Sequence, residues 1–140
     1  MSPLEALALA DQLRAAVADE RVLAAVASIP RDRFVPPDLR ERAYENVALP
    51  IGCEQTISQP LVVARMLEAL KLGAEDRVLD IGTGSGYHAA LLGMLAGHVW
   101  TIERHAELSA EAERVIHESI RGAVDLIWPT LPSELEDAQG

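Results

Sequence analysis

The residues best suited to chemistry lie in one glycine-rich stretch, residues 80–86, which reads D-I-G-T-G-S-G. It follows an apolar run and precedes a helical pattern, so it predicts a turn that joins a strand to a helix. Such turns bind ligands in open α/β sheets, because glycines let the backbone approach the ligand and the helix N-terminus offers free N–H groups. The spacing of Gly82, Gly84 and Gly86 differs from the G-x-G-x-x-G dinucleotide motif, and no Lys-Ser/Thr follows as in a P-loop.

Two carboxylates flank this turn. Asp80 would repel a pyrophosphate, but it can accept a hydrogen bond from an ammonium group. Glu103 ends the next apolar run, 21 positions after Gly82 (103 − 82), where a carboxylate commonly holds a ribose diol. A ligand with an adenosine ribose and a positively charged amino-acid end satisfies both, and S-adenosylmethionine has this form. The alternative is an ordinary strand–turn–helix connection with two incidental acids.

Ser58 is a third candidate, in the run Ser58-Gln59-Pro60. The run predicts a helix start, with Ser58 as the N-cap and Pro60 in the first turn. A helix N-terminus with a hydroxyl cap and free amides suits a carboxylate ligand. The alternative is that Ser58 is only an N-cap, worth ~1 kcal/mol.

Apolar spacing and helix breakers predict the elements that position these residues. Alternating strands and helices indicate the start of a parallel α/β sheet. Residues 46–55 are predicted to be irregular, because Pro50 and Gly52 interrupt regular structure. The predicted helices are 4–18, 20–29 with Asp19 as its cap, 38–44, 60 to about Gly73, 87–95 and 105–120, and the predicted strands are 77–81, 98–103 and 124–128.

The composition of the 140 residues narrows the function classes. With 12 Lys and Arg against 22 Asp and Glu, the net charge is −10, which argues against nonspecific nucleic-acid binding and against an anionic membrane surface. The single cysteine, Cys53, excludes an internal disulfide, and the four histidines show no metal-ligand spacing, so no metal site is predicted. Without a basic N-terminal region or a long apolar run, the chain is predicted to be cytoplasmic.

Three segments together resemble the protein-L-isoaspartate O-methyltransferase family. They read RDRFVP (31–36), LPIGCEQTISQPLVVA (49–64) and RVLDIGTGSGYHAALL (77–92), and the resemblance covers roughly residues 20–116. It implies an α/β fold with N-terminal helices followed by a Rossmann-like S-adenosylmethionine methyltransferase sheet. It also implies methyl transfer from S-adenosylmethionine to the α-carboxylate of L-isoaspartyl residues, a repair reaction whose partners are isoaspartyl-containing proteins or peptides.

The resemblance also assigns site residues. Ser58 matches the family's active-site serine, and Glu54 stands where the family usually has glycine. The residues that match the cofactor site are Gln55, Thr56, Ile57, Asp80, Gly82, Thr83, Gly84, Gly86 and Glu103.

The family resemblance weakens after about residue 116, and no G-D-G element follows. We therefore expect the N-terminal portion of such an enzyme: a helical and substrate-loop region (1–60), a partial cofactor-binding domain of two or three strands (61–128) and a disordered tail (129–140). An uncovered sheet edge favours self-association, and activity is expected to be weak or absent. The alternatives are a methyltransferase with another acceptor and a non-catalytic cofactor-binding fragment.

Overall fold

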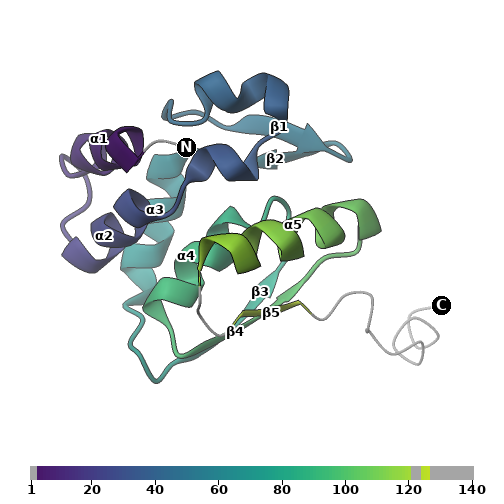
Figure 1. The fold of residues 1–140 in the computed structure, drawn as a ribbon. Coiled ribbons are helices and arrows are strands. Elements are labelled where there is room, and N and C mark those ends of the chain that lie inside the picture. The colour runs from purple at the N-terminus through teal and green to yellow at the C-terminus, as the bar shows by residue number, and fades with distance from the viewer. Residues whose placement is uncertain (1–2, 121–123, 127–140) are drawn as a thin grey trace.

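The structure, a computed structural model, describes residues 3–120 and 124–126. Helices and a hairpin precede a three-stranded parallel sheet with two covering helices (Figure 1). The elements are α1 (Pro3–Leu13), α2 (Glu20–Ser28), the 3₁₀ helices η1 (Arg31–Phe34) and η2 (Pro37–Arg42), β1 (Leu49–Gly52), β2 (Gln55–Ile57), α3 (Pro60–Leu70), β3 (Arg77–Ile81), α4 (Tyr87–Leu95), β4 (His98–Ile102), α5 (Ala106–Ser119) and β5 (Val124–Leu126).

The first helix, α1, ends at Leu13, whereas the sequence predicts a helix over 4–18. The backbone N–H groups of Ala18 and Asp19 donate to Glu68 of α3, at 2.7 and 2.9 Å, instead of continuing the helical pattern. Asp19 then caps α2 as predicted, since its carboxylate accepts from the backbone N–H of Arg21. Glu68 thereby ties the connection between α1 and α2 to α3.

The segment between α2 and α3 differs most from the prediction. The predicted helix 38–44 is the 3₁₀ helix η2, and the predicted irregular segment contains an antiparallel hairpin, in which Leu49 pairs with Ile57. The turn of this hairpin is Cys53-Glu54, with φ values of 51° and 58°. Two left-handed central residues are what a type I′ turn requires. A Cys-Glu pair is atypical there, so the sequence pattern did not reveal the turn.

Helix α3 ends earlier than predicted. Lys71, with φ 50°, takes the left-handed position at the end of the helix, whereas the sequence predicts a helix to about Gly73. Gly73 lies in the turn that follows, where its backbone N–H donates to Asp76 at 2.7 Å. Lys71 therefore adopts a conformation that usually favours glycine.

The sheet has the order β3-β4-β5, and both strand pairs are parallel. Strand β3 pairs with β4 from Arg77 opposite His98 to Ile81 opposite Ile102. One face packs under α4 and α5, where Val99 and Val124 are buried in the core. On the other face Leu79 is 56% exposed and Ile81 is 79% exposed. Among the described residues, β3 pairs with β4 alone, so its other edge has no strand partner there. The predicted tail 129–140 lies outside the described residues.

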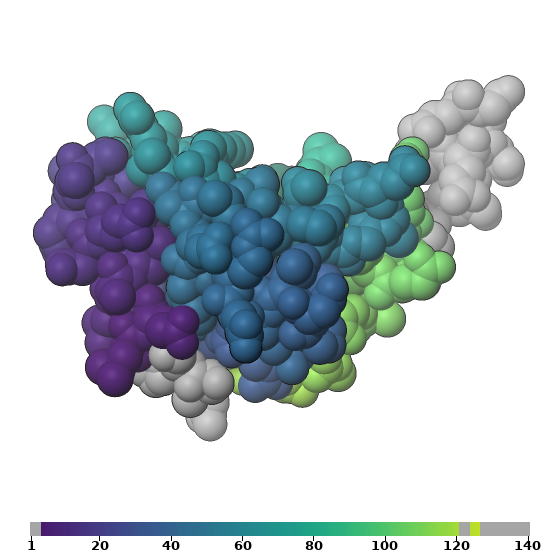
Figure 2. All heavy atoms as spheres, turned by 90° about the horizontal axis from the view of Figure 1, so that it is seen from above, coloured from purple at the N-terminus to yellow at the C-terminus, as the bar shows by residue number. Residues whose placement is uncertain are grey.

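The N-terminal half packs onto the sheet's helices through α2, which contacts α3 and α4, and through η1, which contacts α5. Figure 2 shows residues of about 30–57 lying between the N-terminal helices and the C-terminal part of the molecule. This placement brings the hairpin over the end of the sheet where the glycine-rich turn lies. None of the helices described here is long and apolar enough to cross a membrane.

Candidate functional site

The glycine-rich turn begins where β3 ends. Gly82, Gly84 and Gly86 all have positive φ, of 89°, 56° and 92°. The backbone N–H groups of Gly82 and Thr83 donate to the carbonyl of Ile102, which ties the turn to the end of β4. A side chain at Gly82 would project into open space, whereas a Cβ at Gly86 would lie 3.1 Å from Ala112 and Ile116 of α5. Gly82 thus leaves room at the surface of the turn, and Gly86 permits close packing of α5.

A buried hydrogen-bond network links the glycine-rich turn to the strands β3 and β4. The Thr83 hydroxyl lies 2.6 Å from that of Thr101, which donates to Asp80 at 2.8 Å. Burial raises the pKa of the Asp80 carboxyl and lowers the pKa of His88, whose Nδ1 lies 3.9 Å from Asp80 Oδ1. The Nε2 atom of His88 is buried with no hydrogen-bond partner among the described residues. Sequence reasoning had placed Asp80 against the ligand but missed Thr101 and His88.

Glu103, the first residue after β4, is only 5% exposed. One carboxylate oxygen accepts from the backbone N–H of Gly84 and the other from that of His105, both at 2.8 Å. Glu103 therefore joins the glycine-rich turn to the start of α5. Each oxygen has a second lone pair, so the carboxylate retains capacity for further hydrogen bonds.

The hairpin and the glycine-rich turn share a cavity of about 130 Å³, which we call the hairpin cavity. It brings together six of the predicted site residues: Thr56, Ile57, Ser58, Gly82, Thr83 and Gly84. Tyr87 and His88 from the start of α4 also line it. The four remaining predicted residues do not line it. Gln55 is exposed on the hairpin, and Gly86 packs against α5. Asp80 and Glu103 instead hold the turn, through Thr101 and through the backbone of Gly84.

Ser58 is not the helix cap that the sequence predicts. The N-cap of α3 is Gln59, and the Asn46 side chain accepts from the backbone N–H of Leu61 at 2.9 Å. Asn46 thus supplies from 15 residues away the hydrogen bond that an N-cap side chain usually makes (61 − 46). The Ser58 side chain is exposed, and its hydroxyl makes no hydrogen bond within the described part of the chain. The interpretation of Ser58 as only a structural cap is therefore wrong.

Arg31 holds the backbone of Ser58 from behind and was missed by sequence reasoning. Its side chain is fully buried and donates to the carbonyls of Ala43 at 2.7 Å, Ser58 at 2.9 Å and, more weakly, Val47 at 3.4 Å. Its guanidinium also lies over the Tyr87 ring, 4.7 Å from the ring centroid. Burial lowers the pKa of Arg31, but a guanidinium stays charged in a protein. The only sequence signal was the position of Arg31 in the RDRFVP segment.

Cys53, at the tip of the hairpin, donates from its thiol to Glu107 of α5 at 3.2 Å. Hydrogen bonding to this carboxylate raises the pKa of Cys53, so the thiol stays protonated and is a poor nucleophile. The contact also ties the hairpin tip to α5. No cluster of three or more metal-ligating side chains occurs in the described ranges.

Comparisons with known proteins match most of the described chain to one family. The family model of protein-L-isoaspartate(D-aspartate) O-methyltransferase (PCMT) matches residues 5–128. The protein-L-isoaspartate O-methyltransferase of Paramagnetospirillum magneticum is 56% identical over 100 residues, 71% of this chain and 47% of its own length. That of Koribacter versatilis is 58% identical over 96 residues, 69% of this chain and 43% of its own length. The chain thus spans about half the length of the curated relatives it matches.

Solved structures show the same fold. A protein-L-isoaspartate O-methyltransferase superposes with a TM-score of 0.73 at 26% identity, over 84% of this chain and 40% of that one. A putative Plasmodium falciparum enzyme of the same name, in complex with S-adenosyl-L-homocysteine, superposes with a TM-score of 0.69 at 21% identity, over 96% of this chain and 69% of that one. The predicted fold class, helices followed by a small Rossmann-like parallel sheet, is confirmed.

Proposed function

The chain belongs to the protein-L-isoaspartate(D-aspartate) O-methyltransferase family, and from this premise we propose that it methylates the α-carboxylate of L-isoaspartyl residues in damaged proteins, with S-adenosylmethionine as the donor. The observation that carries the proposal is the hairpin cavity. In it Ser58, whose hydroxyl has no hydrogen-bond partner among residues 3–120 and 124–126, lines the same space as a glycine-rich turn of the kind that binds ligands in α/β sheets.

The residues around the turn fit the donor. The open space at Gly82 and the exposed rim formed by Gln55 and Thr56 leave room for a ligand. The hairpin cavity is smaller than the ~300–1,000 Å³ of most ligand sites, so it would enclose only one end of the cofactor. Thr56, Ile57, Gly82, Thr83 and Gly84 would hold that end.

The carboxylates of Asp80 and Glu103, which bond to the turn and its strand ends, suit the polar groups of the same cofactor. Asp80 has one oxygen bonded to Thr101, and its other oxygen would accept from the ammonium group. The remaining lone pairs of Glu103 would accept from the ribose hydroxyls. Gly86 would contribute indirectly, because its close packing fixes α5 and the start of α4. When bound, the cofactor supplies an activated methyl group.

Ser58 would bind the acceptor. A carboxylate is already a nucleophile at neutral pH, so this chain need not provide a general base, and its task is orientation. The exposed Ser58 hydroxyl would donate a hydrogen bond to the isoaspartyl carboxylate. The Arg31 guanidinium donates to the Ser58 carbonyl at 2.9 Å, which fixes the Ser58 backbone and places a buried positive charge beside it. The chain as a whole has a net charge of −10. The charge of Arg31 would favour the anionic acceptor locally.

Methyl transfer from radiolabelled S-adenosylmethionine tests the proposal. We expect label in a peptide with an L-isoaspartyl residue and none in the same peptide with aspartate. Ser58→Ala removes one hydrogen bond to a charged group, so kcat/KM should fall about 10- to 100-fold. Ser28→Ala is the matched control, since Ser28 bonds only to its own helix at Ala24 and lies outside the hairpin cavity.

Three outcomes would contradict parts of this proposal. A folded Ser58→Ala chain with the wild-type rate would remove Ser58 from the mechanism. Labelling of unrelated acceptors, but not of the isoaspartyl peptide, would show a different substrate. Binding of S-adenosylhomocysteine without any methyl transfer would leave the chain a non-catalytic cofactor-binding protein.

A further inference from the structure

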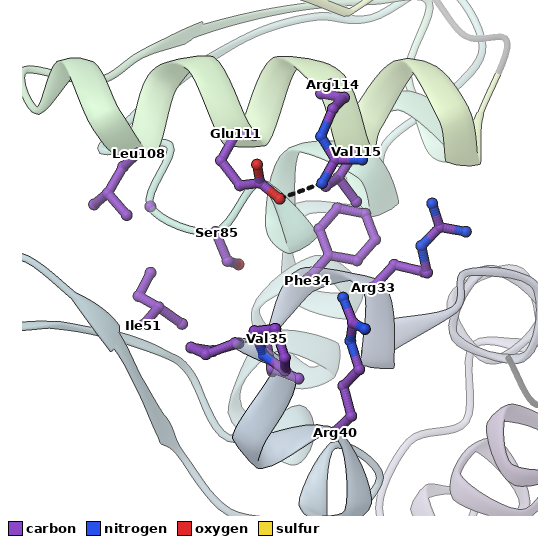
Figure 3. A pocket seen from close by; sticks show the side chains of 14 residues that line it. Arg33, Phe34, Val35, Arg40, Ile51, Ser85, Leu108, Glu111, Arg114 and Val115 are labelled. Atoms are coloured by element: carbon purple, nitrogen blue, oxygen red, sulfur yellow. Dashed lines mark hydrogen bonds and ion pairs between the residues drawn. The ribbon is translucent and has the colours of Figure 1, made fainter.

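A second and larger cavity lies on the other side of the glycine-rich turn from the hairpin cavity. It has a volume of about 370 Å³ and lies between η1, η2 and α5. Gly84 and Ser85 line both cavities, so the two cavities adjoin at the turn. We call the second one the arginine cavity. Figure 3 shows its lining, with α5 above and the segment of Phe34, Val35 and Arg40 below.

The walls of the arginine cavity are largely apolar. Phe34, Val35 and Ile51 contribute from one side, and Leu108 and Val115 from α5 (Figure 3). A cavity of this size and character accepts an aliphatic or aromatic side chain.

Three arginines stand around these apolar walls, and two of them are already neutralised. Arg114 forms ion pairs with Glu111 and Glu118, and Arg33 pairs with Glu118. Arg40 is exposed, and its guanidinium has no ion pair or hydrogen bond within the described ranges. In Figure 3 its side chain extends from η2 toward Phe34 and the space under α5. Within the part of the chain that the structure describes, Arg40 is therefore the one arginine of the cavity whose charge is unpaired.

This distribution of charge selects the class of ligand. A guanidinium pairs well with a carboxylate, which it can hold through two parallel hydrogen bonds. Because Glu111 and Glu118 already balance the charges of Arg114 and Arg33, the single charge of Arg40 matches a ligand with one carboxylate better than a ligand with several. The best complement is one carboxylate attached close to one apolar side chain, as in a peptide where Asp or Glu adjoins a large apolar residue.

We infer that the arginine cavity binds a segment of the acceptor protein, with an apolar side chain between η1 and α5 and a neighbouring carboxylate on Arg40. The choice of partner rests on the proposed function. Because Gly84 and Ser85 border both cavities, a chain whose damaged residue lies at Ser58 could continue into the arginine cavity. The cavity would then add affinity for acceptors that carry an acidic–apolar pair near the damaged residue.

Fluorescence anisotropy with two labelled peptides tests this inference. Both peptides lack an isoaspartyl residue and place Leu in a Gly/Ser context, one after Glu and the other after Gln. We expect the wild-type chain to bind the Glu peptide about fivefold more tightly, the upper range for a partly exposed ion pair. Arg40→Gln should abolish that preference. Arg42→Gln is the matched control, because Arg42 is nearby and pairs with Glu45 but does not line the cavity.

Two results would overturn the inference: equal affinity of the wild-type chain for both peptides, or the same loss of preference in Arg42→Gln as in Arg40→Gln. The titration uses neither cofactor nor methyl acceptor, so its outcome is independent of methyl transfer. A chain that methylates isoaspartyl peptides but ignores the Glu-to-Gln change retains the proposed function and lacks this site. A chain that prefers the Glu peptide but transfers no methyl group supports the site and contradicts the activity.

Discussion

Replacing Arg31 with Met should cost more stability than replacing any surface arginine. The guanidinium makes short hydrogen bonds to the carbonyls of Ala43 and Ser58 and a longer one to Val47. Each buried carbonyl left without a partner costs about 1–3 kcal/mol. Replacing Arg31 also removes the desolvation cost of a buried charge, which offsets part of the lost stability. The lowered pKa of Arg31 reflects that desolvation. The balance predicts a loss of about 2–4 kcal/mol.

Such a loss is a large share of the ~5–15 kcal/mol that stabilises a typical domain. It corresponds to a fall in Tm of roughly 10 °C for a chain of this size. Urea unfolding followed by far-UV circular dichroism measures it directly. Arg31→Lys should lie between wild type and Arg31→Met, since one ammonium keeps the charge but cannot reproduce the planar fork.

Arg33→Met is the matched control for this prediction. Arg33 is two residues away and forms a partly exposed ion pair with Glu118, so its loss should change the free energy of unfolding by about 0.5 kcal/mol or less. An Arg31→Met chain as stable as wild type would mean that the desolvation cost of the buried charge outweighs its hydrogen bonds, contrary to this prediction. Equal losses of stability in Arg33→Met and Arg31→Met would contradict it as well.

Four further perturbations follow from the structure. Glu54→Gly should raise the free energy of unfolding measured in urea by about 0.5–1 kcal/mol, because Glu54 has a φ of 58°, whereas Glu75→Gly, at a residue without positive φ, should not. Glu107→Gln should accelerate iodoacetamide alkylation of Cys53 at pH 8, since Glu107 raises the pKa of the thiol; an unchanged rate would refute that contact. Burial lowers the pKa of His88, so as pH falls below 6.5 the imidazole takes up a proton in the unfolded chain before it does so in the folded one, and the free energy of unfolding falls. Between pH 7.5 and 5.5 the wild type should therefore lose more stability than His88→Gln, and equal losses would contradict this. We propose that the uncovered edge of β3 causes self-association, so Ile81→Lys should make the molar mass from light scattering independent of concentration, while Leu4→Lys, at an equally exposed apolar residue of α1, should not.

The second half of the fold could be predicted from the sequence because its signals are local. The apolar run of β3 matches the predicted strand, and α4 matches the predicted helix, residue for residue. Glycines with positive φ mark the turn between them. β4 and α5 differ from the predicted bounds by one residue at their ends. Strong apolar periodicity bounded by glycine leaves few alternatives for the backbone.

The segment around Ser58 could not be predicted in the same way, because distant residues determine its structure. The cap of α3 comes from Asn46, and the Ser58 carbonyl is held by Arg31, 27 residues away. The hairpin turn uses Cys53 and Glu54 where Asn and Gly are usual. No local pattern encodes such contacts.

The candidate site was predicted in part for the same reason. Residues on the two loops, among them Ser58 and Gly82, face one cavity, as the family resemblance implies. The structure adds contacts that spacing did not predict: Asp80 accepts from Thr101, and Glu103 accepts from the backbone of Gly84, so both carboxylates also hold the turn and the strand ends together. Spacing along the chain identified the strand ends, but it carried no information on which way these side chains point.

Every proposed step of methyl transfer requires that the hairpin and the glycine-rich turn form a cofactor site. Isothermal titration with S-adenosylhomocysteine tests this claim without requiring activity. We predict saturable binding with one site per chain, and loss of that binding in Thr56→Trp, where a large side chain would fill the hairpin cavity from the exposed strand β2. Absence of saturable binding to the folded wild-type chain, or unchanged affinity in a folded Thr56→Trp variant, would contradict the claim.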